Sequence, residues 1–83
     1  MVRVAHALSD PTRVRLFYFL APKGSSVSDL AEAFCLAAST VSHHLGVLLD
    51  AGLVRVRAEG RRHLYGRRSL QVVLVTSAAD TSD

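Results

Sequence analysis

Two adjacent histidines, His43 and His44, and a single cysteine, Cys35, are the side chains of this 83-residue chain best suited to metal binding or catalysis. On a helix, adjacent side chains diverge by about 100°. Chelation of one ion from a helix instead uses residues three or four apart. The two histidines are therefore poorly placed to hold a metal ion between them.

Catalysis by a Cys–His pair needs a third group that orients the base. Cys35 falls in a break between two helical segments, His43 is expected to face outward, and no third member is evident. We therefore expect no enzymatic activity. A lone cysteine cannot form an internal disulfide. Cys35 stays a candidate redox or sensor residue, or a small, partly buried thiol.

The histidines belong to the segment 38–50, which is predicted to be an amphipathic helix. Val41, Leu45 and Leu48 recur at offsets of four and three and would face the core. The opposite face is small and polar, so the helix can enter a groove, where hydroxyl and imidazole groups bond phosphates or base edges. We predict DNA contacts from this helix by Ala38, Ser39, Thr40, Ser42, His43 and His44.

Three further helical segments are predicted before it. Residues 1–8 suggest a helix of about two turns, and Asp10 with Pro11 is a typical helix start. The helix that they begin would bury one face, formed by Val14, Phe17 and Leu20 or Ala21. A helix over 26–34, a break at 35–37 and the helix at 38–50 resemble a helix-turn-helix over about 27–50.

After Gly52, a C-cap signal, the hydrophobic period changes from 3.6 to 2. Val54 and Val56 are expected to point to one side and Arg55 and Arg57 to the other. A turn at "EGRR" and a return strand complete a predicted β-hairpin over about 53–67.

Positive charge is concentrated in this hairpin. Residues 53–68 hold six arginines and one acid, a local charge of +5, while the rest has four basic and six acidic residues. Such a distribution indicates a polyanion partner. We predict DNA contacts from the hairpin by Arg55, Arg57, Arg61 and Arg62.

The composition is that of one small globular domain, with 49% hydrophobic and 20% charged residues. We expect this mostly α domain with a small β-hairpin to span 1–68, followed by a short C-terminal helix or disordered tail over 69–83. No apolar run approaches a membrane span and no signal-peptide pattern is evident. The sequence thus favours a cytoplasmic protein without a membrane partner.

The segments "ALSDPTRVRLFYFL", "VSDLAEAF", "STVSHHLGVLLDAGLV" and "EGRRHLY" resemble the ArsR/SmtB-type family of bacterial winged-helix repressors. They cover most of residues 7–65 in the family's order. The resemblance implies a winged helix-turn-helix and a homodimer on an operator with inverted symmetry. The helix at 38–50 would enter the major groove, with Arg61 and Arg62 on the wing.

The usual metal sites of this family are missing from the sequence. Ser26 and Ser28 stand where many metal sensors of the family carry cysteines, and hydroxyls are poor ligands for soft metals. No histidine follows His63, so the C-terminal site is also missing. We therefore expect no metal cofactor. A subunit-bridging site using His6 or Cys35 stays open as an alternative.

Three further positions depart from the family pattern. Cys35 and Ala37 stand where relatives often have a turn glycine and a capping hydroxyl, and Gly46 where they often have a basic residue.

The dimer seam is expected between 1–9 and 69–77. A transcriptional repressor with an unknown inducer is the preferred function; the alternatives are a metal- or thiol-responsive sensor and a winged-helix module that docks protein.

Overall fold

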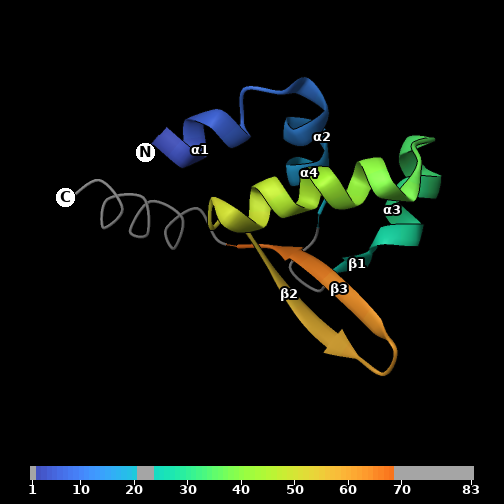
Figure 1. Cartoon of the computed structure of the whole chain (residues 1–83). Helices are drawn as coiled ribbons and strands as arrows, with labels where there is room; N and C mark the ends of the chain where they lie inside the picture. The colour runs from blue at the N-terminus through green and yellow to red at the C-terminus, as the bar shows by residue number, and fades with distance from the viewer. Residues whose placement is uncertain (1, 21–23, 69–83) are drawn as a thin grey trace.

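The computed structural model describes residues 2–20 and 24–68. Four helices and a small sheet account for most of these residues, and the sheet extends away from the helices (Figure 1). Mostly α structure with a β-hairpin confirms the predicted fold class. The elements in chain order are α1 (Val2–Ala7), α2 (Pro11–Phe19), β1 (Ser25–Ser26), α3 (Val27–Phe34), α4 (Ala38–Asp50), β2 (Val54–Glu59) and β3 (Arg62–Arg67).

Helix α2 begins as its sequence predicts. The Asp10 side chain accepts hydrogen bonds from the backbone N–H groups of Thr12, at 2.8 Å, and Arg13, at 3.2 Å. Pro11 is the first helical residue, where its missing N–H costs nothing. The carboxylate satisfies two of the four N–H groups that every helix start leaves without a partner inside the helix.

The core lies between the four helices and the near end of the sheet. Val41, Leu45 and Leu48 of α4 are completely buried, as predicted. On α2 the prediction was partly wrong, because Leu16 is completely buried whereas Val14 is only half-buried. Each fully buried leucine contributes roughly 1.5–3 kcal/mol. The other fully buried large side chains are Leu20, Leu30, Leu53 and Val54.

The sheet has the strand order β1-β3-β2 with antiparallel pairing. Glu59 pairs with Arg62 across a two-residue turn, and Gly60 at its first position has a φ of +63°, which glycine adopts without strain. Val54 is buried, but Val56 is 40% exposed. Val56 is exposed because the hairpin extends beyond the helices that cover Val54 (Figure 1).

The short strand β1 was not predicted. It pairs Ser25 with Tyr65 and Ser26 with Leu64, and two serines carry no alternating apolar signal. Gly24 just before it has a φ of +97°, and a Cβ there would lie 3.0 Å from the Cβ of Leu64. Only glycine therefore allows the chain to approach β3 at this point.

The expected tail at 69–83 lies outside the described residues, and the domain boundary at 68 stays a prediction. Within the described part of the chain, no single helix is long and apolar enough to cross a membrane. The pair α3 and α4 meets the same criteria of length and composition only when taken together across a 113° bend.

Candidate nucleic-acid interface

Helices α3 and α4 form a helix-turn-helix. A break of three residues, 35–37, separates them, and their axes are bent by 113°, within the range of about 90–120° for this motif. Cys35 adopts a left-handed backbone conformation with φ 54° and ψ 43°. The backbone N–H of Leu36 then donates to Ala31 O at 3.0 Å. This bond caps α3, and the chain then turns into α4.

Helix α4 starts without a side-chain cap. Ala37 occupies the N-cap position with extended backbone and makes no side-chain hydrogen bond, as its sequence predicts. The N–H groups of the first turn are therefore left for solvent or a ligand. An anion near this end of α4 would be stabilised by those groups and by the helix dipole.

The outer face of α4 is exposed and polar, as predicted. Ala38, Ser39, Thr40, Ser42 and His43 are all exposed, while the core stripe on the opposite side is completely buried. Within the described residues, the hydroxyls of this face and the His43 ring make no hydrogen bond. A Cβ added at Gly46 would meet no atom within 4 Å. This face can therefore approach another surface closely and still offer polar groups.

His44 differs from His43. It is half-buried, and its Nδ1 lies 3.3 Å from Nη1 of Arg13. The rings of the two histidines are 5.7 Å apart between centroids and tilted by 57°. The predicted DNA contact by His44 stays a prediction, and its partner inside the protein was not predicted. The contact ties α4 to α2.

Arg13 is a functional candidate that sequence reasoning missed. It is only 8% exposed, and its Nε donates to Ala7 O at 2.9 Å and its Nη2 to His6 O at 3.4 Å. The guanidinium thus satisfies carbonyls at the end of α1. Arg13 lies three residues before Leu16, on the same buried face of α2. This spacing could have predicted that its side chain is buried.

The wing arginines divide into two groups, which the sequence did not reveal. Nη2 of Arg62 lies 2.9 Å from Oδ2 of Asp29 and donates to Ser26 Oγ at 3.1 Å. Arg57 pairs with Glu59 at 3.0 Å on the same strand. Both ion pairs are more than half exposed, so each contributes at most about 1 kcal/mol to stability. In this structure neither of these two arginines points freely toward a ligand.

Arg55 and Arg61 are exposed and have no hydrogen-bond or ion-pair partner among the residues described. Arg61 lies in the hairpin turn. The other two arginines of the segment pack back against the rest of the domain. Arg67 lies over the Phe17 ring, 5.7 Å from its centroid, and Arg68 donates to Gly52 O at 3.5 Å. Arg55 and Arg61 are therefore the wing cations available to a polyanion.

Ser26 has a structural role. It is 5% exposed, and its Oγ accepts from the backbone N–H of Asp29 at 3.2 Å, which caps α3. Its Oγ also lies 3.2 Å from that of Ser28. A hydroxyl at 26 thus starts the helix-turn-helix.

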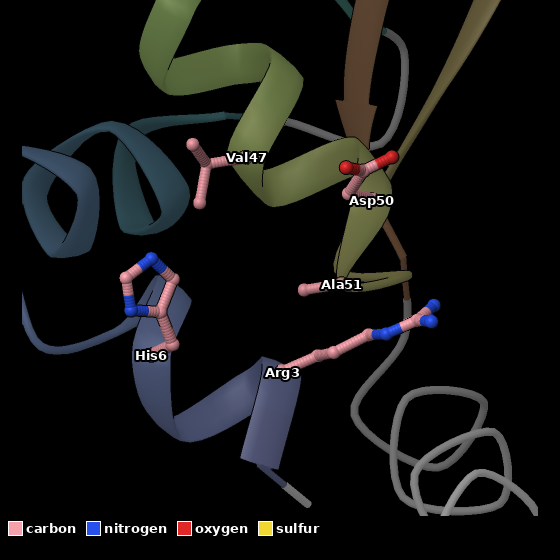
Figure 2. A pocket seen from close by; sticks show the side chains of 5 residues that line it. All are labelled: Arg3, His6, Val47, Asp50 and Ala51. Atoms are coloured by element: carbon pink, nitrogen blue, oxygen red, sulfur yellow. The ribbon is translucent and has the colours of Figure 1, made fainter.

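The residues of the alternative sensor site lie on separate elements. Figure 2 shows His6 and Arg3 of α1 facing the end of α4 across a pocket, with Val47, Asp50 and Ala51 on the other side. Cys35 is exposed in the turn between α3 and α4. No three His, Cys, Asp or Glu residues within the described ranges are placed to hold one metal ion.

The helix pair bent by 113°, the exposed polar face of α4 and the arginine-bearing hairpin define a winged helix-turn-helix domain. A family model described as a helix-turn-helix domain matches residues 8–57. The chain belongs to the ArsR/SmtB family of winged helix-turn-helix transcriptional regulators, as its relatives show. These are DNA-binding proteins and not enzymes.

Two curated relatives illustrate this similarity. The chain is 38% identical over 66 residues to the cadmium resistance transcriptional regulatory protein CadC homolog of Staphylococcus aureus, covering 78% of this chain and 54% of that protein. It is 36% identical over 88 aligned positions to the regulator CmtR of Mycobacterium bovis, covering 98% and 75%. The chain spans about half the length of several curated relatives that it matches.

Solved structures have the same fold. The homodimeric winged helix-turn-helix DNA-binding domain Mb0332 from Mycobacterium bovis is 32% identical, with a TM-score of 0.79 over 98% of this chain and 79% of that one. Reduced HlyU from Vibrio cholerae has a TM-score of 0.76 at 25% identity, covering 99% and 88%.

Proposed function

We propose that this chain is a sequence-specific transcriptional repressor that binds an inverted-repeat operator as a homodimer. The observation that carries the proposal is the outer face of α4, whose hydroxyls and His43 ring are exposed and make no hydrogen bond within the described residues. Groups of this kind on a helix that follows a tight turn suit base edges in the major groove. A regulator of this kind acts on DNA in the cytoplasm.

The face of α4 supplies specificity in this proposal. Ser39, Thr40 and His43 contact base edges, with Ala38 and Ser42 beside them. Gly46 lets the backbone come close, because it has no side chain on this face. One lost base contact costs about 1–3 kcal/mol of discrimination.

The wing supplies affinity. Arg61 and Arg55 contact phosphates or the minor groove and add the same energy on every sequence. Arg57 and Arg62 contribute to the positive field while they pair with Glu59 and Asp29.

Dimerisation is supported by the homodimeric relative Mb0332. The expected seam includes residues 1–9, where Leu8 is half-buried and packs against the core. Its other half, 69–77, lies outside the described residues. A two-fold dimer presents two copies of α4, which is the geometry that an inverted repeat requires.

The test is a binding titration on two duplexes, the DNA upstream of the protein's own gene and a random sequence, at several salt concentrations. His43→Ala should weaken upstream binding about tenfold and random binding much less. Tyr18→Phe, on the exposed face of α2, is the matched control and should change neither. Equal losses on both duplexes would reduce His43 to a phosphate contact.

The same titration separates the alternatives. A winged-helix module that docks protein would show no steep salt dependence on duplex DNA. A thiol-responsive sensor would lose upstream binding when Cys35 is oxidised or alkylated, and Cys35→Ser would abolish the response. Sedimentation at micromolar concentration tests the homodimer.

A further inference from the structure

The contact between Arg13 and His44 has a chemical consequence beyond holding two helices together. A guanidinium only donates hydrogen bonds. Nδ1 of His44, which lies 3.3 Å from Arg13 Nη1, must therefore accept this hydrogen bond through its lone pair. A ring with a lone pair on Nδ1 is neutral. The ring proton is then on Nε2.

Arg13 is fixed in place independently of His44. It is 8% exposed, and Nε and Nη2 donate to the carbonyls of Ala7 and His6 at the end of α1. Nη1 of Arg13 is therefore held next to Nδ1 of His44 by a guanidinium whose position is fixed, and not by a mobile surface side chain. A donor held in this way selects one tautomer and one orientation of the ring.

The other ring nitrogen is left for a ligand. The two nitrogens of an imidazole point in widely different directions, so Nε2 is directed away from the buried guanidinium. The ring is half-buried, and within the described part of the chain Nε2 has no hydrogen-bond partner. It lies at the edge of the exposed face that carries Thr40 and His43, where the DNA backbone passes if α4 occupies a major groove.

We propose that Arg13 is a positioning residue for DNA binding, which holds His44 as the Nε2–H tautomer so that this N–H donates to a backbone phosphate oxygen beside the groove. The inference rests on the proposed function of α4. It divides the paired histidines by role: His43 reads bases, and His44, oriented from inside the protein, fixes the helix on the backbone. Phosphate contacts of this kind set register and carry little sequence information.

The first measurement needs no DNA. Two-bond proton–nitrogen correlation spectra of the ¹⁵N-labelled protein above neutral pH report which ring nitrogens carry protons. His44 should show an unprotonated Nδ1 and a protonated Nε2, whereas exposed His43 should show tautomer averaging. An averaged His44, or one protonated at Nδ1, would overturn the proposal.

The second measurement is duplex affinity. His44→Leu removes the donor and should weaken binding about tenfold on upstream and random DNA alike, as expected for one hydrogen bond to a charged group. His44→Gln, which can accept from Arg13 and donate outward, should retain binding within about threefold. Equal losses for Gln and Leu would contradict the proposal.

A double-mutant cycle tests whether Arg13 acts through His44. Arg13→Lys should weaken binding about tenfold with His44 present, and less than about twofold in the His44→Leu background. Arg15→Lys, exposed on the same helix, is the control. Thermal unfolding establishes that each variant is folded, and the two His44 variants keep the test valid if Arg13→Lys does not fold.

Independent losses in the cycle would show that Arg13 is structural only and would overturn its positioning role. A wild-type protein that binds neither duplex would overturn the proposed function and with it the phosphate contact. The tautomer spectra of the DNA-free protein would still report on the Arg13 contact, so the two failures can be told apart.

Discussion

Nη2 of Arg62 lies 2.9 Å from Oδ2 of Asp29, so the wing is joined to helix α3 by an ion pair between residues 33 positions apart in the sequence. Ser26, which caps α3, accepts a second bond from the same guanidinium. The pair thus adds a side-chain contact between the hairpin and the start of the helix-turn-helix. It also occupies an arginine that the charge pattern had assigned to DNA.

The first prediction follows from this pair. Arg61→Ala should weaken binding to all duplexes and reduce the slope of log affinity against log salt by about 1, because one phosphate contact is lost. Arg62→Ala should reduce the slope by less than Arg61→Ala does, since its charge is already partly neutralised by Asp29. Salt titrations of the two variants on one random duplex provide the comparison. A larger effect at Arg62 would mean that the ion pair opens on DNA.

The second prediction concerns Cys35, whose φ of 54° lies in the left-handed region. A side chain in that conformation costs roughly 1 kcal/mol, which glycine avoids. Cys35→Gly should therefore stabilise the domain, by less than about 1 kcal/mol after the extra entropy of glycine in the unfolded chain. Urea denaturation measures the change. Cys35→Ala is the control and should not stabilise, because it keeps the Cβ.

The third prediction concerns Gly46, exposed in the middle of α4 with open space around its Cβ position. Gly46→Ala should stabilise the domain by roughly 0.5–1 kcal/mol, because alanine is the better helix former. Gly46→Lys should stabilise somewhat less and also raise affinity for random DNA, with a steeper salt slope. Weaker binding by both variants would indicate that the helix backbone needs the close approach that glycine permits.

Local patterns in the sequence predicted the elements that local chemistry determines. The spacing of Val41, Leu45 and Leu48 predicted the buried and exposed faces of α4, and Asp10 with Pro11 predicted the start of α2. Each depends on residues within a few positions of one another, so periodicity and capping preferences reveal them.

Long-range pairings were not accessible in this way. β1 exists because the edge of β3 is open beside Gly24, and the environment of His44 depends on Arg13, 31 residues away. The spacing of Arg13 from Leu16 could indicate a buried side chain, but no local pattern indicates which residue it contacts. The sequence therefore predicted the candidate site as one face of α4. Which residues elsewhere in the fold contact that face could be seen only in the tertiary structure.

The fourth prediction is that DNA binding does not respond to zinc, cadmium or arsenite. Zinc needs three or four ligands at about 2.0–2.3 Å, and no such group of His, Cys, Asp or Glu is found among the described residues. Affinity for the upstream duplex should be the same with chelator and with each metal. A tenfold change, about 1.4 kcal/mol of coupling, would reveal a site, and His6→Ala and Cys35→Ser would then locate it.

The last prediction concerns acid stability. The backbone N–H of Arg13, assisted by that of Thr12 and by the charge of Arg13, holds the pKa of Asp10 below its ordinary value of 3.8. A carboxyl group whose pKa is lower in the folded state stabilises the fold at every pH above its unfolded pKa. That contribution is lost as the pH falls through the folded value.

Asp10→Asn keeps an oxygen acceptor for the two N–H groups but cannot titrate. Between about pH 5 and pH 2 its unfolding free energy should therefore fall less steeply than that of the wild type. Urea denaturation at a series of pH values gives both slopes. Glu32→Gln, which removes an exposed carboxylate on α3, controls for the change in net charge. If the Asp10 and Glu32 variants reduce the slope of unfolding free energy against pH equally, net charge and not the N-cap of α2 governs the loss of stability in acid.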